Sequence, residues 1–267
     1  MAGERRPPMR RNDRHNRKPR SRAEIEKARE ERLKEQQAKA LEDWRPVTEL
    51  GKKVKAGKIK DIDEALKSKI LESEIVDLLL KTKENILNIG QAKGKFGGGQ
   101  RRIFRQTQKK TREGNRIKFA TCALVGNGNG YVGLAFGKSK ETVPARDKSI
   151  RKAKLNLIKV RRGCGSWEGV ADANSIPFAV EGKCGSIKVQ LMPAPKGTGL
   201  CIEKECAKIL SAAGIKDVWS KTKGQTKTKV NMVKACFDAL KKLSEIKIQE
   251  NHIHSLGIQD GKLKAEE

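Results

Sequence analysis

Lysine and arginine side chains offer most of the chemistry that this sequence could perform. The chain has 267 residues, with 60 Lys and Arg against 32 Asp and Glu, which gives a formal net charge of +28. Cations occur along the whole chain and not only in one tail, so we expect a polyanionic partner: RNA, DNA or an anionic membrane surface. They are densest from Arg101 to Lys118, where Glu113 is the one acidic residue. Because a predicted strand follows, we expect this run to be a binding loop that extends from a sheet.

Glycine-rich stretches that could bind a nucleotide are the next candidates. Gly133–Ser139 differs from a phosphate-binding P-loop, because three residues separate its glycines where four are needed and its interior alternates like a strand. Pro195–Gly199 precedes a predicted helix whose amides would attract an anion, and Lys196 adds charge. A nucleotide kinase could use this loop. No acid/base partner or carboxylate set accompanies it, so a contact between Lys196 and an RNA phosphate is favoured. We expect neither an enzyme nor a bound cofactor.

Metal and redox chemistry have weak support. The six cysteines include no CxxC pair, and the three histidines lie near the two ends of the chain. A zinc site is therefore a weak alternative to reduced, partly buried thiols, and we expect no metal. The longest apolar run, Ile75–Leu80, is far too short to cross a bilayer, and the arginine-rich N-terminus lacks the apolar core of a secretory signal. These features predict a cytoplasmic protein with no membrane partner.

The elements that would position the cations are predicted most clearly between Thr111 and Val160. A basic loop at 111–116 leads into a strand at 117–125, a turn at 126–130, a strand at 131–136 and a helix from about 143 to 158. The sequence GNGNG between two apolar runs favours a tight turn, because Asn and Gly tolerate positive φ. The predicted apolar stripe of the helix consists of Val143, Ile150, Ala153 and Leu157. The cations that we expect to point away from this stripe are Lys148, Arg151, Lys152 and Lys159.

RNA is the polyanion that these elements suit best. Lys138 and Lys140 precede the helix, in a segment that resembles the helix-start element with which double-stranded-RNA-binding domains place lysines across phosphates. Aromatic residues make up only 4% of the chain, which argues against a platform on which bases stack. We therefore expect recognition of RNA shape and phosphates.

The flanking segments divide the chain into five expected parts. A basic arm and charged helix occupy 1–43, a helical segment and Gly-rich connector 44–100, the RNA-binding unit 101–162, a second α+β unit 163–243, and a tail 244–267. The arm is too polar to fold alone and is expected to order on nucleic acid, with a solubilising tail as the alternative. In the second unit we expect a hairpin with strands at 176–181 and 186–192, a helix that ends at Gly214, a strand at 216–220 and a helix that begins at Thr228.

Specific motifs in both units resemble one known family. They are VGNGNGYVGLAFGKSKE in the first unit, and GKCGSIKVQLMPAPKGTGL, AAGIKDVWSKT and NMVKACFDAL in the second. Over about residues 44–243, the chain resembles the small-subunit ribosomal proteins of the universal fifth family (bacterial small-subunit protein five). Trp44–Gly51 and Arg162–Glu168 are similar to its archaeal and eukaryotic branch.

This resemblance implies an α+β fold, in which a double-stranded-RNA-binding-like αβββα domain precedes a second α+β domain with a left-handed βαβ crossover. It implies a structural constituent of the small ribosomal subunit that binds small-subunit rRNA near the mRNA entrance and the decoding region, and that supports assembly and translational accuracy. The implied partners are this rRNA, mRNA, and neighbouring small-subunit proteins of the third and fourth families. The extended basic loop of the family maps onto Lys109, Lys110, Arg112, Gly114 and Arg116, and Glu113 departs from the small or basic residue common there.

Residue types and resemblance together give one set of candidate RNA-binding residues. They are Lys109, Lys110, Arg112, Gly114, Arg116, Lys118, Lys138, Lys140, Lys148, Arg151, Lys152, Arg161, Arg162 and Lys196. A free-standing double-stranded-RNA binder or RNA chaperone is the alternative function. It would bind many duplexes equally, whereas a ribosomal component would saturate at one site per subunit.

Overall fold

The computed structural model describes residues 41–94, 99–165 and 173–261. The chain divides into two compact units, Met1–Arg45 and Pro46–Glu267, and residues 41–43 of the first are helical. Several predicted segments lie outside the described residues. They are the basic arm, most of the charged helix, part of the Gly-rich connector and part of the segment that follows Arg162. Within the described ranges, no helix is long and apolar enough to span a membrane.

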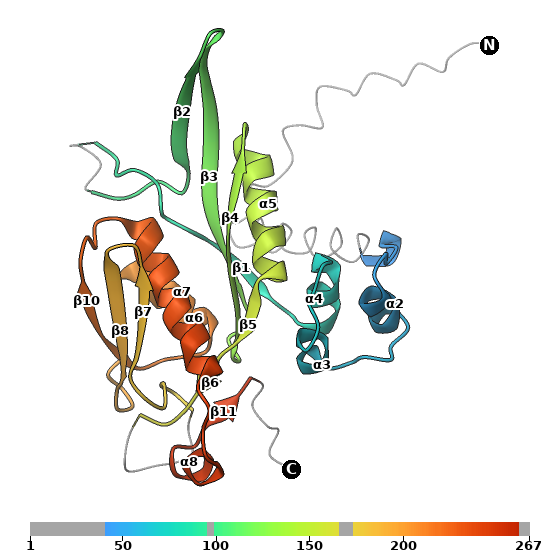
Figure 1. Cartoon of the computed structure of the whole chain (residues 1–267), viewed down its shortest axis with the longest axis vertical. Coiled ribbons are helices and arrows are strands. Elements are labelled where there is room, and N and C mark those ends of the chain that lie inside the picture. Colours follow the sequence, from blue (N-terminus) through green and yellow to red (C-terminus); the bar gives the residue numbers. More distant parts are fainter. Residues whose placement is uncertain (1–40, 95–98, 166–172, 262–267) are drawn as a thin grey trace, which may run out of the picture. The chain divides into compact units, whose positions relative to one another are not determined.

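Three short helices open the second unit: α2 (Glu49–Lys55), α3 (Ile62–Leu66) and α4 (Ser73–Leu79) (Figure 1). The sequence did not predict α2 as a separate helix. Thr48 begins it, because the Thr48 hydroxyl oxygen accepts a hydrogen bond from the Gly51 N–H at 3.1 Å. Helix α4 buries Ile75 and Val76 and contacts α5 (Thr142–Leu155).

The first sheet is antiparallel and is built around its longest strand, β3 (Gly114–Gly126). The other strands are β1 (Lys83–Leu87), β2 (Arg105–Thr111), β4 (Tyr131–Ser139) and β5 (Leu157–Lys159). The order is β1-β3-β4-β5, and β2 pairs with the outer half of β3. As a result, β2 and β3 extend beyond the rest of the sheet as a two-stranded ribbon (Figure 1).

The predicted turn between β3 and β4 is confirmed. Gly128 and Gly130 have φ values of 75° and 88°, a left-handed conformation that other residues rarely adopt. The side-chain oxygen of Asn127 accepts hydrogen bonds from the backbone N–H groups of Asn129 and Tyr131 at 2.8 and 3.2 Å.

Helix α5 (Thr142–Leu155) lies against one face of this sheet through small residues. Two glycines of β4 permit the close approach. A Cβ on Gly133 would lie 2.2 Å from the carbonyl oxygen of Ala153, and one on Gly137 would lie 2.3 Å from that of Ala145. Gly133 and Gly137 therefore allow the backbone of α5 to approach β4 closely.

The predicted start of this helix is confirmed to within one residue, but its predicted end and two members of its predicted apolar stripe are wrong. Val143 is 66% exposed and does not belong to the buried face. Leu157 lies beyond the helix, because the chain leaves the helix at Asn156 and continues as β5. The side-chain amide of Asn156 donates a hydrogen bond to the Leu134 carbonyl oxygen at 2.8 Å, which ties this change of direction to β4.

The second sheet has the strand order β7-β8-β10-β9. Its strands are β7 (Val180–Cys184), β8 (Ile187–Pro193), β9 (Leu200–Cys201) and β10 (Val218–Lys223), and only β9 and β10 pair in parallel among them. Helix α6 (Lys204–Ala212) connects β9 to β10, and α7 (Lys229–Glu245) packs on β7 and β8. Gly214 has φ of 84° and ends α6 as predicted.

The first strand of the predicted hairpin in this sheet was placed several residues too early, whereas the second strand, predicted at 186–192, is confirmed to within one residue. Gly182 and Lys183 are part of β7 and not of the turn, which contains Gly185 with φ of 61°. Gly182 has a packing role instead, since a Cβ there would lie 2.0 Å from the Ala235 carbonyl oxygen of α7. A glycine in a sequence can mark a turn or a close contact, and only the three-dimensional structure distinguishes the two.

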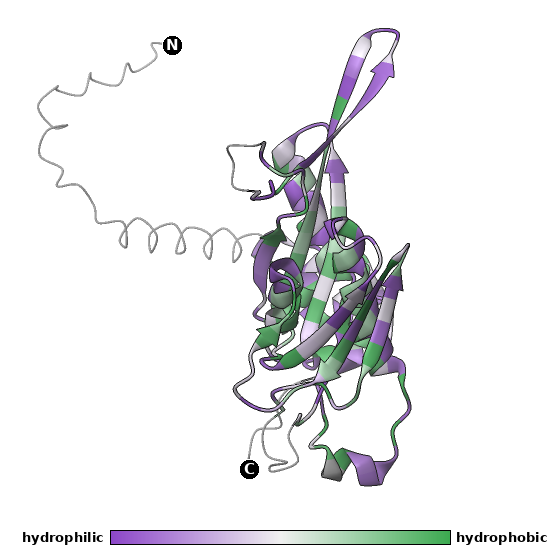
Figure 2. Cartoon of the chain, turned by 90° about the vertical axis from the view of Figure 1, so that its left-hand side faces the viewer, coloured by the Kyte–Doolittle hydropathy of each residue, from purple (hydrophilic) through white to green (hydrophobic). Residues whose placement is uncertain are grey.

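One apolar core joins the two sheets. Leu87 and Leu124 of the first sheet belong to the same buried cluster as Ile209 and Leu210 of α6. Figure 2 shows hydrophobic residues through this body and mainly hydrophilic ones along the projecting ribbon.

The residues after Glu245, which were expected to be an irregular tail, are folded as far as Gly261. They include α8 (Glu250–Ser255) and β11 (Gln259–Asp260), and β11 pairs antiparallel with β6 (Arg161–Arg162). A six-residue helix and a two-residue strand are too short to produce a repeating apolar pattern, so they could not be predicted from periodicity.

Candidate nucleic-acid interface

The outer ribbon carries the densest candidate residues, and it is a β-hairpin and not the predicted loop. Arg105–Thr111 pairs with β3 along its whole length, and Arg112 and Glu113 form the tip. Gly114 follows with φ of 107°, and the Thr111 hydroxyl donates a hydrogen bond to the Gly114 carbonyl oxygen at 2.7 Å. The run was predicted as a loop because it is dense in cations and precedes a predicted strand, but its pairing with β3 makes it a strand.

The register of the ribbon assigns its side chains to two faces. Directly paired residues point the same way, and neighbours along a strand point in opposite directions. One side, which we call the cationic face, carries five cations, Arg105, Lys109, Arg116, Lys118 and, on β4, Lys138, and also Thr107, which is paired with Lys118. The five cations and Thr107 are all exposed. Lys109 and Arg116 are directly paired, so two like charges face each other across the strands.

The other side of the ribbon, which we call the amide face, consists of Gln106, Gln108, Lys110, Asn115 and Ile117. These residues are also exposed. The amide face lies on the α5 side of the sheet. Thr121, on the same side of β3, donates its hydroxyl to the Ser149 hydroxyl oxygen of α5 at 2.9 Å.

The predicted RNA-binding residues therefore occupy both sides of the first sheet. Lys148, Arg151 and Lys152 are exposed on α5, which covers the side of the amide face. The cationic face lies on the opposite side. Lys140 is exposed just before α5, and Arg112 lies at the ribbon tip and belongs to neither face.

Glu113 moderates the charge at the ribbon tip. Its carboxylate forms an ion pair with the Arg116 guanidinium, three residues along the chain. Both side chains are largely exposed, so the pair adds little to stability. It does place one negative charge beside the cationic face.

Lys154 belongs to α5 but is part of a buried ion-pair cluster and not of the exposed cationic surface. Its Nζ lies 2.8 Å from both Asp77 Oδ1 and Glu84 Oε1. Burial raises the pKa of the Asp77 carboxyl, and the hydrogen bond and charge of Lys154 offset this only in part. Burial by itself would lower the pKa of Lys154, but its hydrogen bonds to the two carboxylates outweigh burial and the pKa is raised. The charged lysine therefore ties α5 to α4 and β1.

Two of the predicted RNA-binding residues, Arg161 and Arg162, are used inside the fold. Arg161 donates to Asp260 Oδ1 at 2.8 Å and to the Ile246 carbonyl oxygen at 2.6 Å. Arg162 is 3% exposed and donates to the Gly261 carbonyl oxygen at 2.8 Å. We remove both from the candidate set. Composition alone cannot distinguish an arginine that binds RNA from one that binds the chain's own C-terminal segment.

The Pro195–Gly199 loop is not the anion-binding helix start that the sequence suggested. Strand β9 separates it from α6, and the Glu203 carboxylate accepts hydrogen bonds from the first free amides of α6, at 3.0 Å from Glu205 N. The Gly199 N–H donates to Asp217 Oδ1 at 2.7 Å. Carboxylates of the chain thus take the positions where a nucleotide phosphate would bind. Lys196 is exposed.

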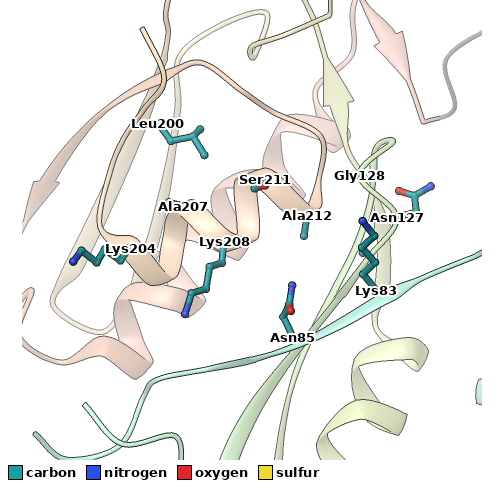
Figure 3. A pocket seen from close by; sticks show the side chains of 11 residues that line it. Lys83, Asn85, Asn127, Gly128, Leu200, Lys204, Ala207, Lys208, Ser211 and Ala212 are labelled. Atoms are coloured by element: carbon teal, nitrogen blue, oxygen red, sulfur yellow. The ribbon is translucent and has the colours of Figure 1, made fainter. Parts of the chain in front are cut away.

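A hollow of about 440 Å³ lies beside α6 and was not predicted (Figure 3). Lys83 and Asn85 of β1, Asn127 of the β3–β4 turn, and Lys204 and Lys208 of α6 line it. These residues come from three distant segments, so no local motif could have identified them. In the part of the chain that the structure describes, no group of three or more His, Cys, Asp or Glu side chains could hold a metal ion.

Comparison with known proteins agrees with this architecture. The family model described as "Ribosomal protein S5, N-terminal domain" matches residues 103–161, and "Ribosomal protein S5, C-terminal domain" matches residues 182–252. A Nanoarchaeum equitans protein named small ribosomal subunit protein uS5 is 48% identical over 227 residues, 84% of this chain and 97% of its own length. The chain belongs to the uS5 family.

Two further uS5 proteins show the same extent of similarity. Those of Methanosphaera stadtmanae and Methanocaldococcus jannaschii are 45% and 43% identical, over 82% and 84% of this chain and 92% and 98% of their own lengths. The resemblance drawn from the sequence motifs is thereby confirmed. The first uS5 domain match spans β2 to α5, and the second begins within β7 and includes α6 and α7.

Proposed function

We propose that this chain is a structural component of the small ribosomal subunit and binds small-subunit rRNA in the cytoplasm. The observation that carries the proposal is its similarity to proteins named small ribosomal subunit protein uS5, matched over nearly their full length. The exposed cations of the ribbon and of α5 supply the sequence-independent phosphate contacts that such a role requires. The role is structural and not catalytic.

The proposed RNA-binding set contains the predicted residues that are exposed. It consists of Lys109, Lys110, Arg112, Gly114, Arg116, Lys118, Lys138, Lys140, Lys148, Arg151, Lys152 and Lys196. The ribbon is the central element, because it projects from the body and its side chains are exposed on both faces.

The finer assignments rest on the family resemblance. We place the chain near the mRNA entrance and the decoding region, beside small-subunit proteins of the third and fourth families, with a role in assembly and accuracy. The proposed first domain, about 101–162, is double-stranded-RNA-binding-like, which is supported by antiparallel strands with α5 across one face. The second, about 163–243, would have a left-handed crossover at β9–α6–β10. The segment that follows it returns to the end of the first domain, where β11 pairs with β6.

In-cell ultraviolet crosslinking with sequencing of the attached RNA tests this function. We expect crosslinks at a few positions of small-subunit rRNA, with peptides of the ribbon among the crosslinked sites. Crosslinks spread over mRNA and unrelated duplexes, with rRNA no more frequent than its abundance, would support the free-standing double-stranded-RNA binder instead.

A further inference from the structure

We propose that the two faces of the ribbon bind different parts of the RNA at the same time: the cationic face binds phosphates, and the amide face binds base edges and riboses. The inference rests on the proposed function and goes further, because it assigns separate roles to affinity and to recognition within one hairpin. It follows from the register of β2 and β3 and from the chemistry of each face.

Apart from the Thr107 hydroxyl, the side chains of the cationic face can only donate hydrogen bonds. Lysine and arginine carry no acceptor, so they fit the acceptor-only oxygens of a phosphodiester. Lys109 and Arg116 are directly opposite each other, and like charges at paired positions of a ladder destabilise it. A phosphate between the two side chains removes that repulsion. Lys138, paired with Ala120 on β4, extends the same row of charge onto the body of the sheet.

The amide face carries one cation, Lys110, and otherwise has different hydrogen-bonding groups. Each Gln or Asn side chain offers two N–H donors and a carbonyl oxygen that accepts. A carbonyl oxygen gains nothing from a phosphate, which has no donor, but it can accept from a base amino group or a ribose 2′-hydroxyl. Gln106, Gln108 and Asn115 provide three such groups on one side. Ile117, paired with Gln108 and 39% exposed, adds an apolar contact for a base or a sugar.

Both faces are open at once because the ribbon is only two strands wide and one layer thick. The side chains of β2 from Arg105 to Lys110 are exposed on both sides, as are those of β3 from Asn115 to Lys118. A hairpin alone is only marginally stable. Here β3 continues into the buried sheet, where Thr121 is hydrogen-bonded to α5, so the base of the ribbon is held firmly.

The two faces can be separated by measuring salt dependence and specificity together. The full-length chain is titrated by filter binding against transcribed small-subunit rRNA and against poly(A)·poly(U), over a series of KCl concentrations. One variant changes the cationic face (Lys109→Gln, Arg116→Gln and Lys118→Gln). The second changes the amide face (Gln106→Ala, Gln108→Ala and Asn115→Ala). The charge-matched control changes Lys52, Lys53 and Lys58 to Gln, which are exposed at or near α2.

The cationic-face variant should lower the slope of log K against log[KCl] by about 2–3, at roughly 0.7–0.9 per lost phosphate contact. Its preference for rRNA over poly(A)·poly(U) should not change. The amide-face variant should keep the wild-type slope and lose about tenfold or more of that preference. The control should alter neither quantity by a comparable amount.

Hydrogen exchange at the β3 amides confirms in each variant that the hairpin remains folded. Equal effects of the two ribbon variants on slope and on preference, or an unchanged preference in the amide-face variant, would overturn the division between faces. A wild-type chain with no preference for rRNA would instead overturn the proposed function, so the two failures are distinguishable.

Discussion

Replacing Lys154 with methionine should lower the free energy of unfolding by about 2–4 kcal/mol. The Nζ of Lys154 lies 2.8 Å from Asp77 and from Glu84, and its side chain is 9% exposed. Methionine keeps most of the buried stem but leaves the two carboxylates without a cation between them. Removing one partner of a buried pair costs about 3–5 kcal/mol. The carboxylates are 31% and 27% exposed, so water screens part of this cost and a somewhat smaller loss, about 2–4 kcal/mol, is expected.

The loss should depend on pH in a defined direction. The pKa of the Asp77 carboxyl is raised in the fold by burial, with Lys154 as a partial offset. A carboxyl with a raised pKa binds its proton more readily in the folded state, so folding becomes less favourable as pH rises through the interval between the two pKa values. Without Lys154 this interval extends to higher pH. The pKa of Lys154 is also raised, so its charge is fully present at neutral pH in the wild-type protein. The Lys154→Met variant should therefore lose more free energy of unfolding, relative to wild type, at pH 7 than at about pH 4.

Urea unfolding followed by circular dichroism at both pH values measures this effect. Lys159→Met is the matched control, because the Lys159 Nζ lies 2.7 Å from Asp63 Oδ2 but the two side chains are 34% and 45% exposed. A more exposed pair should contribute less than about 1 kcal/mol. An equal loss in the two variants, or a Lys154→Met loss that is the same at both pH values, would refute the reasoning.

Three further predictions concern packing, RNA affinity and thiol reactivity. Gly133→Ala would place a Cβ 2.2 Å from a carbonyl oxygen of α5 and should lower the free energy of unfolding in urea by about 1–3 kcal/mol. The control Gly94→Ala, where a Cβ would meet open space, should be nearly neutral. Equal effects of the two substitutions would contradict the close contact. Glu113→Gln removes the ion pair with the Arg116 guanidinium and should increase the affinity for rRNA a few-fold in filter binding. A lower affinity would contradict the view that Glu113 weakens phosphate binding at the ribbon tip. Burial raises the pKa of the Cys122 thiol, whereas Cys201 is exposed. Iodoacetamide should therefore label Cys201 in the native protein and Cys122 only after unfolding. Peptide mass spectrometry measures the labelling of each cysteine.

The sequence predicted two kinds of element: those whose side chains alternate between core and solvent, and turns in which glycine is required by the local backbone conformation. The β3–β4 turn was recognised because its Asn and Gly residues suit positive φ. The strand Arg105–Thr111 was missed because both its faces are in water, and a strand without a buried face has no apolar alternation. Helix α5 was found, but its true buried face consists of small residues, such as Ala145 and Ala153, which give a weak hydrophobic signal.

For the candidate interface, the sequence predicted a region rich in cations but not the partners of each side chain. Charge density pointed to the ribbon and α5, whose lysines and arginines are mostly exposed in the structure. It could not show that Lys154, Arg161 and Arg162 bind partners within the chain, since those partners are up to 99 residues away in sequence. The pairing register that separates the two ribbon faces also depends on the fold.

The pairing of β6 with β11 sets an order of events during synthesis of the chain. Arg162 and its acceptor Gly261 are 99 residues apart, so a translating ribosome needs roughly 5–20 s between them, at about 5–20 residues per second. The strands of the first sheet, with its ribbon, are all made before that interval begins. Until α6 (Lys204–Ala212) is made, about halfway through that interval, Leu87 and Leu124 lack the α6 side chains that share their core. Apolar surface that is exposed in this way during folding is a site for chaperone contact. The ribbon is therefore available to nascent rRNA while the second half of its own protein is still being translated.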